Sequence, residues 1–395
     1  MKISLVTRAS VAVLSVAGMV MAAPAAEARS GVDDEKLTSA LEEAHRAGMP
    51  GVQGAVRAGG QAWRGASGVA DLATGRPVRP DMRHRVGSIT KTFTAAAIMQ
   101  QVEKGRVQLD APISRYLPHV VPGERGEKIT VRMLLNHTSG IPDYLLAAFP
   151  SLAAMSAKSL DDNRFRHFSP AELITMGLAL LARKPGSLPG VYSNTNYLIL
   201  GLLLEKVTGT TAKAYITEHV IRRAGLRHTT LPTGPRIKGP HPRMYEAMHG
   251  QIDPPRDYSV YDPSWVGVGA ALVSTVEDLN RFYGALLDGR IVTRASLAQM
   301  QRTVPVSTQV YEDKIDYGLG LHKVTIPGCG TFWGHNGTMW GAGAVSLIRA
   351  DGARQMSYAI NLIRWNALDA SGTPQPHPID EALSAFQQQA LCATA

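Results

Sequence analysis

The chain has 395 residues, of which 45% are hydrophobic and 18% are charged, and its formal net charge is +9. This composition supplies enough apolar side chains for a sizeable core and excludes global disorder, while the length allows two lobes or one large α/β unit with an insertion. A basic protein can associate with anionic cell-wall polymers, but Lys and Arg form no dense run and no nucleic-acid-binding motif is present, so we expect no nucleic-acid partner.

Residues 1–28 are predicted to be a signal peptide. Lys2 and Arg8 make the start positive, residues 9–23 are apolar, and small residues surround the expected cleavage site at residues 26–28. The alternative is a membrane anchor, although the apolar stretch is short for a membrane span. No later segment is long and apolar enough to cross a bilayer. We therefore expect a secreted, cell-wall-associated protein without a stable membrane span, and we expect a monomer.

Predicted helices and strands are distributed unevenly along the rest of the chain. Apolar residues at helical spacing predict helices at 33–48, 89–104, 170–183, 196–207, 276–287 and 379–391. Alternating runs near glycines predict a hairpin at 52–70 and strands around 317–326, 331–334, 342–349 and 355–363. The region of about 126–260 is predicted to be largely helical with long loops. Strands at both ends of the chain with a helical lobe inserted between them predict an α/β fold.

Ser88 and Lys91 form a Ser-x-x-Lys motif at the expected start of the helix 89–104. Residues three positions apart share one helix face, so the Lys91 amine can reach the Ser88 hydroxyl. A lysine with a lowered pKa can remove the proton of a serine and make it a nucleophile. The helix dipole disfavours a charged lysine and favours the oxyanion formed on attack. The alternative is a helix N-cap serine beside a surface lysine.

Tyr192 and Asn194 form a Tyr-x-Asn triplet on an expected turn that points outward before an apolar helix. A tyrosine can relay a proton between a nucleophile and a leaving group, and an asparagine can hydrogen-bond a substrate amide. The alternative is a helix-capping turn with a half-buried tyrosine.

His335, Asn336, Gly337 and Thr338 follow a short strand-like run. A strand edge that ends in a polar residue and a glycine lets a substrate backbone lie close and pair as a β-strand does. The N–H groups of this segment are candidates to complete an oxyanion hole with the N–H of Ser88. The alternative is a structural histidine.

Cys329 and Cys392 are the two cysteines of the chain. An even number of cysteines in an exported protein permits one disulfide, which would join the C-terminal helix to the strand region before His335. In the chain-entropy model, closing a loop of that length is worth roughly 4 kcal/mol. Two free buried thiols are the alternative.

The three motifs, in the order Ser-x-x-Lys, Tyr-x-Asn and His-x-Gly, resemble those of the penicillin-recognising serine hydrolases, the superfamily of class C β-lactamases and D-alanyl-D-alanine carboxypeptidases. Further similar segments are residues 129–144 (ITVRMLLNHTSGIPDY), 192–209, 265–278 and 317–321 (YGLGL). The likeness covers nearly all of the chain after residue 33 and is closest to Streptomyces-type D-alanyl-D-alanine carboxypeptidases, whose actinobacterial members carry a cysteine pair like the one here. It implies a β-lactamase/transpeptidase-like domain over residues 29–395, in which helices flank an antiparallel sheet and the active site lies between two lobes.

The resemblance also implies catalytic roles. Ser88 would attack the carbonyl of a D-Ala–D-Ala bond and form an acyl-enzyme, with Lys91 as the base. Tyr192 would pass the proton to the departing D-Ala, and His335 would support this proton network and the substrate carboxylate. Water or an amino acceptor would release the acyl group, β-lactams would acylate the same serine, and no metal or cofactor is needed.

Substrate-binding positions are implied at Asn194, Trp265, Asn336 and Thr338, with the backbone N–H of Thr338 in the oxyanion hole. Two departures concern recognition of a terminal carboxylate. Asn336 replaces the Thr or Ser usual in the third motif, and His322 stands where the Streptomyces enzyme carries a carboxylate-binding Arg, with Lys323 next to it as a possible substitute. They put strict carboxypeptidase specificity in doubt and leave the acylation residues intact.

Three activities are therefore compatible with the sequence. An exported D-alanyl-D-alanine carboxypeptidase is the leading hypothesis. A β-lactamase, an esterase or a D-amino-acid peptidase of the same fold is the alternative. A non-catalytic binder of cell-wall peptides or β-lactams is disfavoured by the intact Ser88, Lys91 and Tyr192 set.

Overall fold

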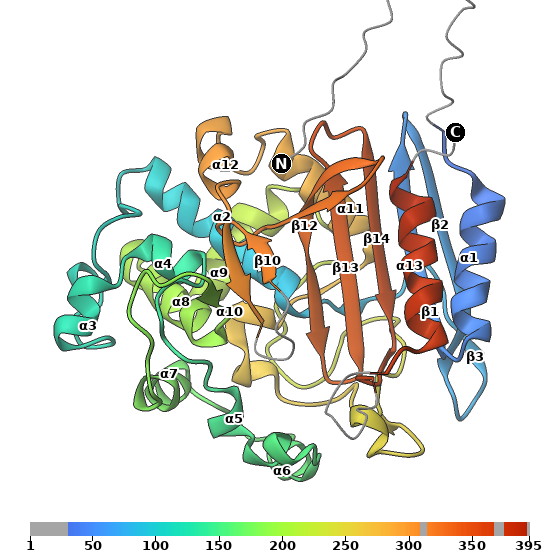
Figure 1. Ribbon diagram of the computed structural model, residues 1–395, viewed down its shortest axis with the longest axis horizontal. Helices are drawn as coiled ribbons and strands as arrows, with labels where there is room; N and C mark the ends of the chain where they lie inside the picture. Colours follow the sequence, from blue (N-terminus) through green and yellow to red (C-terminus); the bar gives the residue numbers. More distant parts are fainter. Residues whose placement is uncertain (1–30, 309–313, 367–374, 393–395) are drawn as a thin grey trace, which may run out of the picture.

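The protein forms an α/β lobe built around a large sheet and a mostly helical lobe beside it (Figure 1). The computed structural model describes residues 31–308, 314–366 and 375–392. The predicted signal peptide, residues 1–28, lies outside the described residues. Within the described ranges, no helix is both long and apolar enough to cross a bilayer.

A ten-stranded sheet is the framework of the α/β lobe. In spatial order its strands are β3 (Arg76–Pro77), β2 (Gln61–Asp71), β1 (Gly51–Ala58), β14 (Arg354–Ile360), β13 (Ala342–Arg349), β12 (Gly330–Met339), β11 (His322–Ile326), β10 (Lys314–Tyr317), β9 (Val304–Ser307) and β5 (Gly190–Val191). Neighbouring strands are antiparallel except for the parallel pair β9–β5. Because β1 pairs with β14, both ends of the chain build one sheet, which confirms the predicted α/β fold.

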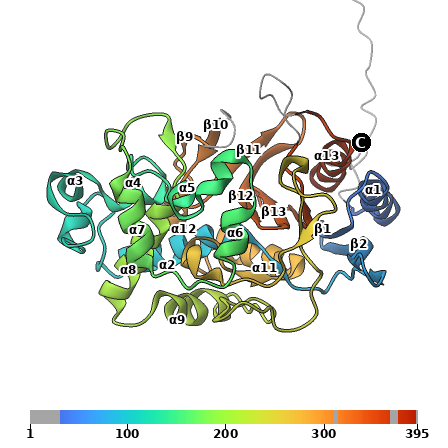
Figure 2. The ribbon, with the colours of Figure 1, turned by 90° about the horizontal axis from the view of Figure 1, so that it is seen from below.

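Helices cover both faces of the sheet (Figures 1 and 2). Helices α1 (Asp34–Arg46) and α13 (Pro378–Leu391) lie together on one face, and α11 (Val276–Leu287) packs on the other. Helix α2 (Thr90–Glu103) is buried almost all round and packs against α8 (Asn194–Thr208) and α10 (Gly267–Ala270). Since residues 90–101 of α2 are buried, any polar side chain among them needs partners inside the protein.

The region of about 126–260 is largely helical with long loops, as predicted. Its helices include α4 (Val131–Leu135), α5 (Leu145–Ala148), α6 (Lys158–Asp162), α7 (Pro170–Ala179), α8 (Asn194–Thr208) and α9 (Ala212–Ile216), with α3 (Gly123–Lys128) before them and α10 (Gly267–Ala270) and α12 (Arg294–Met300) after them. A small sheet is formed by β15 (Leu362–Ile363), β6 (Tyr245–Glu246) and β7 (Arg256–Asp257), and β4 (His84–Arg85) pairs with β8 (Val273–Ser274).

Three predicted strands differ from the structure. The run 355–363 is divided into β14 and β15, which belong to different sheets. The run 317–326 is not one strand but two, β10 and β11, joined by a turn in which Gly320 has φ of 73°. The strand predicted at 331–334 continues to Met339, so the His335 motif lies inside β12 rather than after it. Among the described residues, β11 pairs with β12 only as far as Gly334. The segment after Gly334 therefore has an open edge on that side, which is the property expected of a strand that receives a substrate.

A disulfide joins Cys329, in the turn between β11 and β12, to Cys392 at the end of α13. The two Cα atoms are 5.0 Å apart, a usual separation for a disulfide. The predicted pairing is therefore present. It ties α13 to the hairpin whose second strand carries His335.

Replacing both cysteines with serine should lower the free energy of unfolding by about 4 kcal/mol, because the bridge closes a loop of 63 residues in the unfolded chain. Urea unfolding followed by circular dichroism measures this change. Wild-type protein unfolded under reducing conditions is the control and should match the double variant. Equal midpoints for oxidised wild type and the double variant would contradict the prediction.

Candidate active site

Ser88 lies at the entrance to α2, in a single 3₁₀ turn (Gly87–Ile89) that leads into the helix. Gly87 has φ of 53°, a conformation that favours glycine. The Thr90 hydroxyl donates to the Gly87 carbonyl at 2.7 Å and closes the turn. Ser88 is partly exposed, whereas Lys91, one helical turn later, is fully buried. The structure thus presents the serine to the cleft and encloses the lysine behind it.

The Lys91 amine is held by three oxygen atoms. Its Nζ lies 3.1 Å from Ser88 Oγ, 2.7 Å from Asn194 Oδ1 and 3.1 Å from the carbonyl oxygen of Gly269. Burial lowers the pKa of Lys91 from 10.5 to about 7, and the Asp143 carboxylate opposes this change. A large fraction of the amine is therefore neutral at neutral pH, which is the form that can accept the Ser88 proton.

Asp143 is a site residue that the sequence reasoning did not single out. Its carboxylate accepts hydrogen bonds from the Asn194 backbone N–H at 2.9 Å, the Asn194 side-chain amide at 2.7 Å and the Leu145 N–H at 2.9 Å. It therefore orients Asn194, which in turn holds Lys91. The available signal was its place in the LLNHTSGIPDY segment, but nothing in the local sequence revealed a contact with Asn194. The expected contact of Asn194 with a substrate amide stays a prediction, since both ends of this side chain already have partners in the structure.

Tyr192 is brought to the site by β5, the strand that joins the helical lobe to the sheet. Its backbone N–H donates to the Ser307 carbonyl at 3.0 Å, and its ring lies 4.9 Å from Lys91 Nζ. The hydroxyl is buried rather than turned outward, and it has no hydrogen-bond partner of good geometry within the described residues. Burial raises the pKa of Tyr192 well above its usual value, and the Ser88 side chain opposes the rise. The tyrosine is therefore neutral and keeps a proton that it can donate.

Two glycines allow β12 to approach the start of α2. A Cβ atom on Gly337 would lie 2.0 Å from the Val86 oxygen and 2.7 Å from the Ser88 nitrogen, and a Cβ on Gly87 would lie 2.6 Å from the Thr338 nitrogen. Such distances are far below van der Waals contact. Each glycine thus lies against the backbone nitrogen of the other segment, Gly337 against Ser88 and Gly87 against Thr338, which is compatible with the expected oxyanion hole.

Three histidines gather near Lys91. His335 Nε2 lies 3.1 Å from the Tyr317 hydroxyl, Nδ1 lies 2.5 Å from the Asn336 carbonyl oxygen, and its ring lies 3.9 Å from that of His322. Burial lowers the pKa of His335 and of His137 well below 6.5 and that of His322 to about 3, so all three are neutral. His335 faces Tyr317, and its ring centre is 6.5 Å from that of Tyr192. Among the described residues, no three His, Cys, Asp or Glu side chains are grouped to hold one metal ion.

Lys323 does not take the place of a carboxylate-binding arginine. Successive side chains of a strand point to opposite faces, so Lys323 points away from its neighbour His322, whose ring faces the site. Its amine lies 3.9 Å from the Asp316 carboxylate instead. The side chains of His335 and Asn336 likewise point to opposite faces of β12. His335 is buried, and Asn336 is exposed on the other face.

A cleft of about 310 Å³ opens beside Ser88. Trp265, Trp340 and Trp365 line it together with Leu145, Met248, Asn194 and Thr338. The Trp265 and Trp340 rings stack with centres 4.6 Å apart. Trp265 and Thr338 therefore line the cleft beside Ser88, and their contact with a substrate stays a prediction; the cleft suits a bulky apolar or aromatic group.

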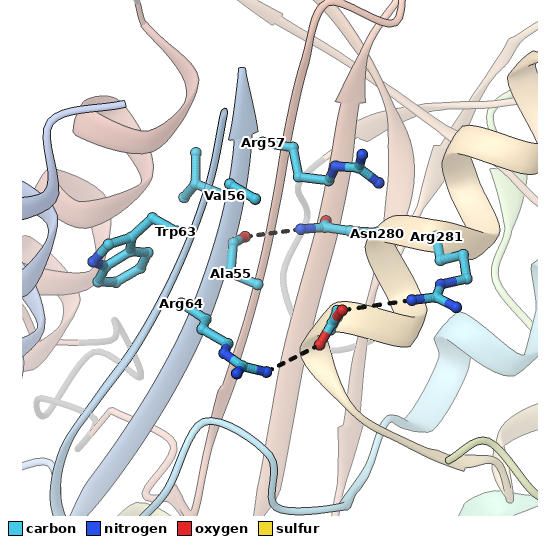
Figure 3. Close-up of a pocket in the computed structure, with 9 residues that line it drawn as sticks. Ala55, Val56, Arg57, Trp63, Arg64, Asn280 and Arg281 are labelled. Atoms are coloured by element: carbon cyan, nitrogen blue, oxygen red, sulfur yellow. Dashed lines mark hydrogen bonds and ion pairs between the residues drawn. The ribbon is translucent and has the colours of Figure 1, made fainter. Parts of the chain in front are cut away.

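A second concavity, of about 430 Å³, lies between the β1–β2 hairpin and α11 (Figure 3). Arg64 and Arg281 both pair with Glu277 there, at 3.4 and 3.5 Å, and Asn280 donates to the Ala55 carbonyl. None of the residues that line it belongs to the Ser88 cluster. Of these two concavities, only the first contains Ser88.

Comparison with known proteins agrees with this geometry. Residues 37–375 match the protein family described as Beta-lactamase. A D-stereospecific amidohydrolase from Streptomyces sp. is 33% identical and superposes with a TM-score of 0.77. The superposition covers 92% of this chain and 100% of the amidohydrolase chain. Penicillin-binding protein 4* of Bacillus subtilis is 25% identical over 74% of the chain, and esterase EstB of Burkholderia gladioli is 33% identical over 49% of it. The chain spans 64% of the length of the former and 49% of the latter.

Substituting alanine for Gly337 should reduce kcat/KM for an activated ester such as p-nitrophenyl acetate by about 100-fold or more, the loss seen when one oxyanion donor is removed. The added Cβ would push β12 away from the Val86 carbonyl and separate the two N–H groups. Gly234→Ala is the matched control, because a Cβ there meets nothing within 4 Å. A folded Gly337→Ala protein with wild-type turnover would contradict the proposed oxyanion hole.

Proposed function

The chain belongs to the beta-lactamase family of serine hydrolases, which has penicillin-binding homologues, and on this premise we propose that it hydrolyses amides or esters of D-amino-acid compounds through a Ser88 acyl-enzyme. The observation that carries the proposal is the buried Lys91 amine, 3.1 Å from Ser88 Oγ. The preference for D-configured substrates is supported by the likeness to the Streptomyces amidohydrolase over its whole length.

In the proposed acylation, neutral Lys91 accepts the Ser88 proton while Oγ attacks the substrate carbonyl. Negative charge develops on the carbonyl oxygen, and the N–H groups of Ser88 and Thr338 stabilise it. The bond to the leaving amine or alcohol then breaks, and the acyl group stays on Ser88. Water attacks this ester with Lys91 again as base, which releases the acid and restores the serine.

Tyr192 is the proposed proton donor to the leaving group. Its hydroxyl stays protonated because burial raises its pKa. Among the described residues, no side chain accepts a hydrogen bond from this hydroxyl. The proton that Lys91 takes from Ser88 then returns to the Tyr192 oxygen, which leaves Lys91 neutral for deacylation; the Lys91 amine lies 4.9 Å from the centre of the Tyr192 ring. The leaving group therefore lies on the Tyr192 side of Ser88.

An uncharged leaving group fits this side better than a terminal carboxylate. His137, His322 and His335 are neutral, and Lys323 is directed away, so no described cation other than Lys91 faces the leaving group. A carboxylate that leaves water needs a cationic or strongly donating partner. An amide nitrogen or an ester oxygen does not, which favours an amidohydrolase or esterase.

The second candidate is the D-alanyl-D-alanine carboxypeptidase expected from the sequence. It is favoured by the His335 motif on β12 and by the similarity to penicillin-binding protein 4*. β-Lactams remain proposed acylating ligands for either activity, and slow β-lactam hydrolysis is compatible with both.

We also propose export to the cell surface. The signal peptide predicted at residues 1–28 motivates this, and the Cys329–Cys392 disulfide supports an oxidising compartment. N-terminal sequencing of protein recovered from the culture medium or cell wall tests it. A mature chain that still starts at Met1 would contradict cleavage. The expectation of a monomer stays a prediction.

Substrate choice separates the two candidates. We expect ammonia from D-phenylalanine amide, none from the L-enantiomer, and slower release of D-alanine from a peptide that ends in D-Ala–D-Ala. Ser88→Ala should abolish both activities, and mass spectrometry after penicillin exposure should place the adduct on Ser88. Efficient release of D-alanine without cleavage of D-amino-acid amides would favour the carboxypeptidase instead.

The pH dependence of kcat/KM should report the Lys91 amine. Because its pKa is lowered to about 7, the neutral base predominates above pH 7 and is lost below it. We expect kcat/KM to rise through about pH 7 and to fall roughly tenfold for each unit below. Lys91→Arg should be inactive, because arginine does not deprotonate. Lys104→Arg, at the far end of α2 beside Tyr215, is the control and should keep the wild-type profile.

A further inference from the structure

Glu246 is the acidic side chain that lines the cleft beside Ser88. It lies on β6 and is only 2% exposed. Among the described residues that line this cleft, none is a lysine or an arginine, and most are leucine, methionine or tryptophan. Burying an ionised carboxylate among apolar side chains costs free energy. Such a group is therefore usually paired with a cation or has a function.

The partners of Glu246 inside the protein are neutral. Oε1 accepts the Met248 N–H and Oε2 accepts the Gly341 N–H, each at 3.0 Å, and the Trp365 side chain is a third neutral donor, so the carboxylate retains part of its acceptor capacity. No ion pair to Glu246 occurs within the part of the chain that the structure describes. Burial raises the pKa of Glu246 to about 7, and the hydrogen bonds from the Gly341 and Met248 N–H groups and from the Trp365 side chain oppose the rise. A cation that entered the cleft would meet a carboxyl group already oriented by the backbone and would favour its ionised form.

The position of Glu246 relative to the reaction follows from the proposed function. Tyr192, His322 and His335 do not line this cleft, whereas Asn194 and Thr338 do. If Tyr192 protonates the leaving group, the cleft lies on the opposite side of Ser88 and holds the acyl portion. The acyl portion would then place an aromatic or apolar group against Trp265 and Trp340.

We propose that Glu246 binds an ammonium group carried by the acyl portion of the substrate, so that the enzyme selects compounds with a free amine over their N-acylated forms. The inference rests on the proposed function for the side of the cleft that the acyl portion occupies. It makes Glu246 a specificity residue and predicts substrates that combine an apolar or aromatic side chain with a free amino group. A purely structural Glu246 would instead join β6 to the turn after β12 and would be indifferent to the amine.

Binding to a catalytically silent protein tests this without relying on turnover. Calorimetry compares Ser88→Ala with Ser88→Ala/Glu246→Gln for two pairs of ligands. The first pair is D-phenylalanine amide and its N-acetyl derivative. The second pair is glycyl-D-phenylalanine amide and its N-acetyl derivative. In at least one pair, Glu246→Gln should weaken binding of the free amine by about tenfold or more and leave the N-acetyl compound within about twofold. Ser88→Ala/Glu277→Gln removes an equal charge at the concavity of Figure 3 and should leave all affinities unchanged.

Each outcome decides between the two roles. Equal affinity losses for free and acetylated members of both pairs, or no binding of the free amines to Ser88→Ala, would overturn the inference. A loss of affinity for the free amine alone supports the inference, even if the wild-type enzyme does not cleave the amide. Failure to cleave the amide would count against the proposed function and not against the role of Glu246. For a pair that the enzyme cleaves, the ratio of kcat/KM between the free amine and its N-acetyl form should fall from wild type to Glu246→Gln. This fall should match the fall in the ratio of their affinities.

Discussion

The enclosure of the Lys91 amine is the constraint on which the rest of the site depends. Helix α2 is buried almost all round, so its lysine cannot reach solvent and must satisfy its donors on Ser88, Asn194 and Gly269. Desolvation makes the charged form costly and brings the pKa near 7, which turns a normally protonated side chain into a usable base. Asp143 limits the shift and fixes Asn194, so the base is tuned as well as held.

The large sheet supplies the second requirement, which is to assemble distant segments around that amine. Strand β5 leaves the helical lobe, pairs with β9 and delivers Tyr192 to the site. Strand β12, anchored by β13 and by the disulfide at its start, comes so close to the entrance of α2 that only glycine fits at Gly87 and Gly337. The geometry of nucleophile, base and oxyanion donors is thus a property of strand pairing rather than of flexible loops.

The electrostatic character of the two sides of Ser88 differs. On the side of Tyr192, buried histidines are neutral and give a polar but uncharged environment. On the other side, aromatic and aliphatic side chains surround the Glu246 carboxylate. Under the proposed function, this asymmetry suits a neutral leaving group and an acyl portion that combines an apolar group with a positive charge.

Much of the fold and of the acylation site was predictable from the sequence, because both depend on local patterns. Helical periodicity located α1, α2, α8, α11 and α13, and a serine and a lysine three positions apart at a helix start share a face whatever surrounds them. The sequence could not reveal Asp143, the facing of His335 toward Tyr317, the direction of Lys323 or the carboxylate of Glu246 in the cleft. These features depend on strand register, on alternation across β11 and β12, and on contacts between residues more than 50 positions apart. The sequence by itself determined the reactive pair, and only the tertiary structure decided its electrostatic surroundings, because burial and long-range pairing set a pKa and a binding preference that no local pattern encodes.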